Sequence, residues 1–176
     1  MAASPFGYRL AHAIGLSGAA WLSGNIAALS LISVPALAET QRETSAPQGL
    51  IVKLWRKVYD KGKAQNPPVA AATATAFLYL AWSVRAGGPL FRHSQYSLTG
   101  LYTTAAILTL SIVPYTIVTM RPTNNALIRL AQTPEDLTSA GVKESSTLLN
   151  RWVFLNGIRS LLPLVGGMLG VTAALL

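Results

Sequence analysis

Three side chains near the C-terminus, Trp152, Asn156 and Arg159, combine residue types and a spacing that could do chemistry. They follow one another at i, i+4 and i+7, so a helix would place all three on one face. The surrounding stretch, 152–176, is apolar and long enough to cross a bilayer, which takes about 20 residues. At 1.5 Å per residue, Arg159 would lie roughly 10 Å deeper than Trp152.

A guanidinium at that depth costs on the order of 2.5 kcal/mol or more to insert, unless it faces protein, water or a polar ligand. Arg159 is therefore a candidate for stabilising negative charge on a bound molecule. The alternative is that its side chain extends to the membrane interface, or only connects helix ends.

The composition sets the class of protein. Of the 176 residues 51% are hydrophobic and 11% charged, and the mean hydropathy is +0.41, too apolar for an ordinary soluble domain. The absence of cysteine excludes disulfides, thiolate catalysis, iron–sulfur clusters and cysteine-bound zinc. Two histidines and six acidic residues leave little for a metal centre, so we expect no metal. The net charge of +8 could suggest nucleic acid, but the positive residues stand in short segments beside apolar runs, which favours a membrane protein.

The sequence predicts an all-α fold, an integral membrane four-helix bundle in a single domain of residues 1–176, with short amphipathic helices in two long connecting loops. The expected spans are residues 10–38, 69–86, 98–120 and 152–176. The first span carries a small residue at every fourth position, which lets another helix approach closely. It exceeds the ~7–15 apolar residues of a signal peptide, so we expect a retained span that ends at Pro35.

Both long connections are expected to contain helices. Within 39–68, apolar and basic residues separate onto two sides of a helix, which should lie in the headgroup layer and stop at Asn66-Pro67-Pro68. Within 123–150, Thr123 or Asn124 could cap a helix over 125–131. A further helix should begin at 133–136, and a segment around Ser145 or Ser146 should lead into the fourth span. Pro114 is expected to kink the third span, and Arg121-Pro122 to end it.

The distribution of basic residues predicts the orientation. The two long connections contain ten: Arg42, Lys53, Arg56, Lys57, Lys61, Lys63, Arg121, Arg129, Lys143 and Arg151. The opposite side has three: Arg9, Arg85 and Arg92. The positive-inside rule then places the long connections in the cytosol and both termini in the lumen or outside. Arg159 would belong to the cytosolic half. His12 would begin the first span at the far end, more than about 20 Å away, so we expect a satisfied interfacial histidine rather than a partner of Arg159.

Four stretches, LISVPAL, WRKVYDKGKAQNPP, RPTNNAL and LLNRWVFLNGIR, resemble the small four-helix membrane proteins typified by fungal anthrone oxygenases. The most specific patterns are Pro122-x-Asn124 with Leu127, and Trp152-x3-Asn156-x2-Arg159. The resemblance implies oxidation of an anthrone to an anthraquinone with molecular oxygen in a polyketide pathway. It further implies no flavin, haem or metal, and as partners an aromatic polyketide and the lipid bilayer, with no nucleic acid.

The residues permit this chemistry. An anthrone is acidic at its methylene carbon, and its anion can donate an electron directly to oxygen, so the protein needs a base and a charge-stabilising group. Arg159 would hold the oxyanion in a low-dielectric site, with hydrogen bonds from Asn156. The candidate bases are Asp60 and Tyr59, although the neighbouring Lys57 and Lys61 favour a solvated helix charge for Asp60. The candidate substrate-binding residues are Trp152, Asn25, Asn124 and Tyr115.

Several alternatives stay open at this stage. Trp152 could stack on the substrate or anchor its helix at the interface. Asn25 could contact a ligand or form only an interhelical hydrogen bond. The same polar residues would also suit a membrane-embedded polyketide cyclase or isomerase that uses no oxygen. Outside the enzymes, the chain could be a small transporter subunit or assembly factor. We expect an endomembrane location resembling the endoplasmic reticulum.

Overall fold

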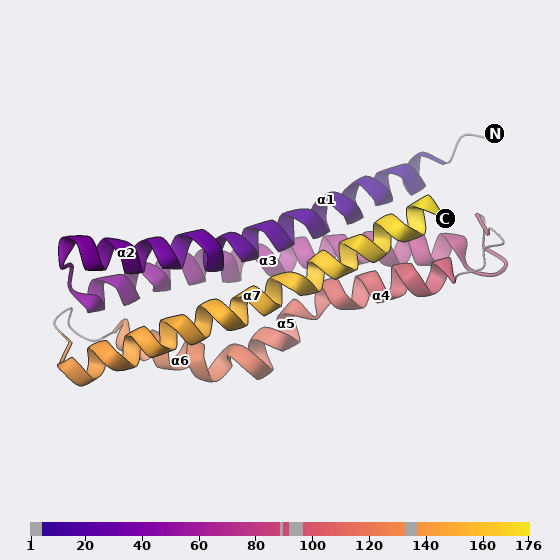
Figure 1. The fold of residues 1–176 in the computed structure, drawn as a ribbon. Coiled ribbons are helices and arrows are strands. Elements are labelled where there is room, and N and C mark those ends of the chain that lie inside the picture. The colour runs from indigo at the N-terminus through magenta and orange to yellow at the C-terminus, as the bar shows by residue number, and fades with distance from the viewer. Residues whose placement is uncertain (1–4, 89, 92–96, 133–136) are drawn as a thin grey trace. The chain divides into compact units, whose positions relative to one another are not determined.

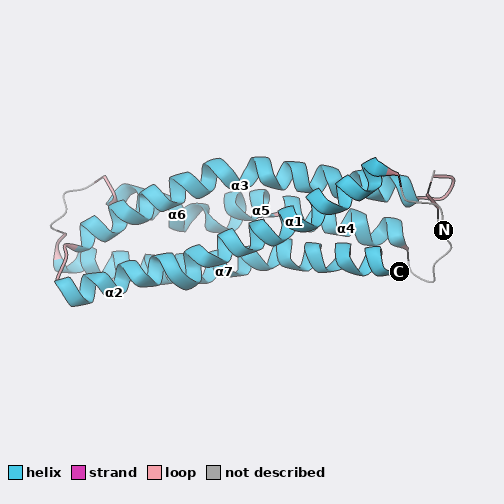
Figure 2. Cartoon of the chain, turned by 90° about the horizontal axis from the view of Figure 1, so that it is seen from above, coloured by secondary structure: helices cyan, strands magenta, loops and turns pink. Residues whose placement is uncertain are grey.

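The computed structural model describes residues 5–88, 90–91, 97–132 and 137–176, and all regular structure within these ranges is helical (Figures 1 and 2). Its elements are α1 (Phe6–Ala28), η1 (Leu29–Ser33), α2 (Val34–Thr44), α3 (Gln48–Val84), α4 (Leu98–Leu110), α5 (Ile112–Tyr115), η2 (Thr116–Met120), α6 (Arg121–Leu130) and α7 (Ser139–Leu175), where η1 and η2 are π-helical turns. They make up four helices long and apolar enough to cross a membrane: Phe6–Thr44, Gln48–Val84, Leu98–Leu130 and Ser139–Leu175. The predicted all-α membrane fold with four spans is therefore confirmed.

The chain forms two compact units, to which all four helices contribute. Unit 1 comprises Met1–Ser23, Asn66–Val113 and Ser160–Leu176, and unit 2 comprises Gly24–Gln65 and Pro114–Arg159. The ten basic residues of the predicted cytosolic side and all six acidic residues belong to unit 2, together with Arg159. Unit 1 has only the three basic residues of the other side. The charges of the chain thus gather in one unit.

Close helix packing around two aromatic rings holds unit 1 together. Phe77 and Tyr102 are fully buried and stack with 6.5 Å between their ring centroids. A Cβ atom at Gly15 or Gly170 would lie only 2.9 or 2.6 Å from the Phe77 ring, so both positions need glycine. This agrees with the close helix approach predicted from the small residues of the first span.

His12 has its hydrogen bonds satisfied within unit 1. Its Nδ1 donates to the carbonyl of Tyr8 at 3.1 Å, which leaves Nε2 to accept from the hydroxyl of Tyr102 at 2.7 Å. These two bonds confirm the prediction of a satisfied histidine.

The outer surface of unit 1 is apolar. Large side chains such as Trp82, Ile107 and Met168 are more than half exposed, at 52%, 61% and 61%. Exposed apolar surface of this kind suits contact with lipid.

Prolines do not end the helices where the sequence suggested. The first helix continues past Pro35 to Thr44, and α3 runs through Pro67 and Pro68 without a break. A proline removes one donor and crowds the carbonyl four residues earlier. The wider turn η1 directly precedes α2, whose first turn contains Pro35, a position that needs no proline N–H. In α3 the affected carbonyls belong to Lys63 and Ala64, on an exposed stretch where water or headgroups can bind them.

The third helix is interrupted near Pro114, as predicted. α4 ends at Leu110, because Pro114 has no N–H to donate to the carbonyl of this residue. A turn at Ser111 then leads into α5 and η2. The helix does not end at Arg121-Pro122, however, because these residues form the first turn of α6.

One further expectation for the connections is wrong. Neither Thr123 nor Asn124 caps a helix, because α6 continues directly from η2 and its first N–H groups follow a helical turn. The segment around Ser145 and Ser146 leads into the fourth span as expected, as part of α7, which begins at Ser139. The helix start expected at 133–136 lies outside the described residues, as do Arg92 and His93.

Candidate functional site

Two tryptophans from different helices form the centre of unit 2. Trp55 of α3 and Trp152 of α7 are 0% and 1% exposed, and their rings meet edge to face at 5.7 Å. Tyr59, one turn after Trp55, stacks on it at 5.3 Å. The apolar side of the α3 segment therefore packs inside the protein, while its level at the headgroup layer stays a prediction. Trp152 likewise lies too deep to anchor its helix at an interface.

The predicted stripe on α7 faces inward. Asn156 and Arg159 are 0% and 8% exposed, one and two turns beyond Trp152. The spacing of i, i+4 and i+7 has placed all three side chains on the buried face, as expected. The alternative in which Arg159 extends to the membrane interface does not fit this burial.

Arg159 lies among hydroxyl groups. Its Nη1 donates a 3.0 Å hydrogen bond to Oγ1 of Thr116, the first residue of η2. The phenols of Tyr59 and Tyr115 are near enough to interact with the guanidinium electrostatically. Within the described part of the chain no carboxylate pairs with Arg159, and its Nε has no acceptor. A buried cation with only neutral partners retains its attraction for an anion.

Asn156 connects α7 to the first helix. Its Nδ2 donates to the carbonyl of Ile26 and to Oγ of Ser30, both at 2.8 Å. Both N–H groups of the amide are thus used within the protein, at the point where α1 passes into the π-helical turn η1. Oδ1 has no donor among the described residues and stays available to a ligand.

Two further predicted residues, Asn124 and Asn25, lie in the same unit. Asn124 is 3% exposed and lies on the inward side of α6 with Leu127, one turn after the buried Met120 of η2, and its Oδ1 has no partner in the described ranges. Asn25 is half-buried, directly before Ile26, whose carbonyl accepts from Asn156.

Asp60 stands apart from this group. Its side chain is 54% exposed and pairs with Arg56 at 3.2 Å, one turn away on the same helix. The structure therefore places Tyr59 within electrostatic range of Arg159 but leaves its neighbour Asp60 at the surface.

Sequence reasoning missed three residues of the site: Thr116, Ser30 and Trp55. Trp55 could have been found, because it stands one turn before Tyr59 on the apolar side of an amphipathic helix. Thr116 and Ser30 gave no signal, since single hydroxyls in an apolar span usually bond to their own helix.

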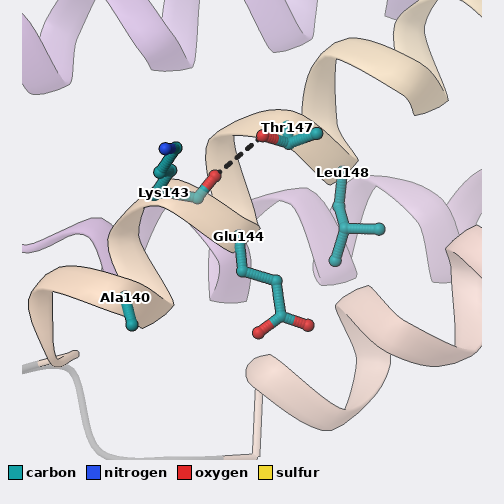
Figure 3. Close-up of a pocket in the computed structure, with 5 residues that line it drawn as sticks. All are labelled: Ala140, Lys143, Glu144, Thr147 and Leu148. Atoms are coloured by element: carbon teal, nitrogen blue, oxygen red, sulfur yellow. Dashed lines mark hydrogen bonds between the residues drawn. The ribbon is translucent and has the colours of Figure 1, made fainter.

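A shallow hollow on the surface of unit 2 does not belong to the site. Figure 3 shows its lining, which comes from one stretch of α7: Ala140, Lys143, Glu144, Thr147 and Leu148. The hydroxyl of Thr147 donates to the carbonyl of Lys143 at 2.9 Å, so it is satisfied within its own helix. None of the predicted site residues lines this hollow.

Comparison with known proteins identifies the family of the chain. Residues 55–169, which include both tryptophans, Asn124, Asn156 and Arg159, match the profile of the family described as anthrone oxygenase. The anthrone oxygenase encC of Aspergillus fumigatus is 40% identical over 92% of this chain and 91% of its own length. An anthrone oxygenase of Claviceps purpurea is 33% identical over 92% and 86%, respectively. A noranthrone monooxygenase of Aspergillus flavus is 32% identical over 86% and 68%. No solved structure matches the chain. From the family match and these identities, the chain belongs to the anthrone oxygenase family.

Proposed function

We propose that this protein is a membrane-embedded monooxygenase that converts an anthrone-type aromatic polyketide into the corresponding anthraquinone with O2 as co-substrate and no cofactor. Its relatives named anthrone oxygenase and noranthrone monooxygenase support the reaction class. The observation that carries the mechanism is Arg159, a buried cation that no described carboxylate neutralises.

The reaction balances without a cofactor. Removal of one proton from the methylene carbon gives a carbanion whose charge is shared with the ring carbonyl oxygen. This anion passes one electron to O2, and the radical pair joins in a new carbon–oxygen bond as a peroxide anion. The peroxide anion takes up a proton, and loss of the second methylene proton then breaks the oxygen–oxygen bond and releases hydroxide, which takes up that second proton. The methylene becomes a carbonyl, and the other oxygen atom leaves as water.

Arg159 would act on the charged intermediates. Its guanidinium would bind the enolate oxygen. A preorganised cation stabilises such a negative charge most strongly in a low-dielectric site. Thr116 would hold the guanidinium in place through the 3.0 Å bond to Nη1, leaving Nε for the substrate. Asn156 would keep α7 and α1 in register and offer Oδ1 to a substrate hydroxyl.

Tyr59 is the better of the two candidate bases. Its phenol is near enough to Arg159 to interact with it electrostatically, whereas the carboxylate of Asp60 is exposed and already paired with Arg56. In this scheme the neutral phenol of Tyr59 relays the methylene proton, taking it up as it passes its own proton to water, and Tyr115 contributes a second phenol near the charged oxygen.

The site would open toward the cytosolic half of an endomembrane resembling the endoplasmic reticulum, with both termini lumenal. The excess of basic residues in the long connections supports this orientation.

The direct test is oxygen consumption by purified protein in detergent with an anthrone and a metal chelator. We expect uptake above the spontaneous rate, one O2 for each anthrone consumed, and no effect of the chelator. Folded protein that gives no uptake above the spontaneous rate would remove the proposal. Conversion of the substrate without oxygen uptake would point instead to a cyclase or isomerase.

A further inference from the structure

Buried polar atoms without partners gather in unit 2. The described residues leave six such atoms unsatisfied there: Nε1 of Trp55, Nε1 of Trp152, Oγ1 of Thr123, Oδ1 of Asn124, Oδ1 of Asn156 and Nε of Arg159. Leaving one buried polar group unpaired costs about 1–3 kcal/mol, and native proteins keep few of them. Six in one unit indicate that these atoms bind something other than the protein.

The two indole N–H groups are the least expected of the six. Both belong to side chains at most 1% exposed, and an indole nitrogen that deep normally donates to a protein oxygen. The rings of Trp55 and Trp152 touch edge to face, so the two unpaired indole groups belong to neighbouring side chains of α3 and α7. Asn124 faces the same core, because Met120 of η2 and Leu127 of α6, one turn before and after it, pack in the cluster that contains both indoles.

We infer that Trp55 and Trp152 are specificity-determining residues whose indole N–H groups donate hydrogen bonds to ring oxygens of the substrate, away from the oxygen that Arg159 holds. This inference depends on the proposed function for the nature of the substrate. An indole can only donate, so it selects a carbonyl, phenol or phenolate oxygen.

The remaining free atoms complement these donors. Oδ1 of Asn124 and of Asn156 can only accept, so they select hydroxyl groups. Donors and acceptors together therefore fit a flat polycycle that carries both carbonyl oxygens and phenolic hydroxyls. An unsubstituted polycycle would leave the same protein atoms buried and unpaired, and the site would reject it for that reason.

The indole N–H groups can be observed directly by NMR. The chain has four tryptophans, and protein labelled with ¹⁵N-tryptophan in detergent micelles should give four indole signals. The probes are a dihydroxyanthraquinone with its hydroxyls beside the carbonyl, and unsubstituted anthraquinone. With the hydroxylated probe, we expect the indole protons of Trp55 and Trp152 to move downfield and those of Trp21 and Trp82 to stay. The latter two are 44% and 52% exposed and serve as internal controls.

Variants then separate recognition from packing. Trp55→Phe and Trp152→Phe keep an aromatic ring but remove the donor, so each should reduce the preference for the hydroxylated probe about 5- to 10-fold. Trp82→Phe is the matched control and should leave the preference unchanged. A purely structural role would weaken both probes equally and overturn the inference, as would bound probe that leaves all four indole signals unmoved. Both measurements follow the binding of a product-like molecule and need no turnover. A protein that consumes no oxygen would therefore refute the proposed reaction, but it could still show the indole shifts and the preference for the hydroxylated probe.

Discussion

At the scale of single residues, the unusual feature is a guanidinium that is 8% exposed and bonded to a threonine hydroxyl. Arginine holds its charge at any physiological pH and presents its donors in a planar fork. Thr116 takes one end of the fork, and Nε stays free among the described residues. A single side chain can thus be fixed by the protein at one donor and bind an oxyanion with another.

This arrangement predicts the result of replacing Arg159 with lysine. The Arg159→Lys variant should fold, because a positive charge of similar length remains, but its oxygen uptake with an anthrone should fall about 100-fold. The ammonium is a point charge that cannot bond Thr116 and the substrate in the fixed geometry of the fork. The measurement is the initial rate of uptake in detergent, corrected for spontaneous oxidation. Arg151→Lys, at an exposed position on the same helix, is the matched control and should keep full activity. Equal rates for the two variants would contradict the assigned role of Arg159.

At the scale of elements, the sequence correctly predicted which face of α7 is buried, because this depends only on the local spacing of residues. The stripe Trp152–Asn156–Arg159 faces inward because its spacing follows the helix period, whatever the neighbouring helices do. The ends of the helices were predicted less well. Pro35 and Pro122 were expected to end helices, yet each lies in the first turn of a helix that directly follows a π-helical turn. Such a turn depends on tertiary contacts, here including the bonds from Asn156 to the first helix, which no single segment reveals.

Two glycines of α7 allow a direct test of helix packing. A Cβ atom at Gly166 would lie 2.9 Å from the backbone oxygen of Ala105, whereas a Cβ atom at Gly157 would meet nothing within 4 Å. Gly166→Ala should therefore destabilise the protein by about 1–3 kcal/mol, because the backbone of α4 must shift. Gly157→Ala should be neutral, or stabilising by up to about 1 kcal/mol, because alanine favours helix. Thermal unfolding in detergent measures both changes, and a tolerated Gly166→Ala would refute the close contact between α7 and α4.

At the scale of the whole molecule, the charged residues are concentrated in one of the two units. Unit 2 carries eleven of the fourteen basic residues and all six acidic ones, and the exposed side chains of unit 1 include many large apolar ones. The helices of 37 residues would be about 55 Å long, well beyond the ~30 Å hydrocarbon core of a bilayer. Part of each such helix must therefore lie outside the hydrocarbon, and the charged ends are the parts that water or headgroups solvate at least cost.

The orientation that follows can be tested because the chain has no cysteine of its own. Glu43→Cys introduces a thiol at an exposed position near the end of α2, and Ala86→Cys introduces one at an exposed position just after α3. In sealed microsomes, a membrane-impermeant maleimide should label the first variant at once and the second only after the membrane is permeabilised, because the positive-inside rule places residue 43 in the cytosol. Labelling of both variants after permeabilisation controls for folding and access. The reverse pattern would place the charged unit in the lumen, and the substrate would then have to reach Arg159 from that side.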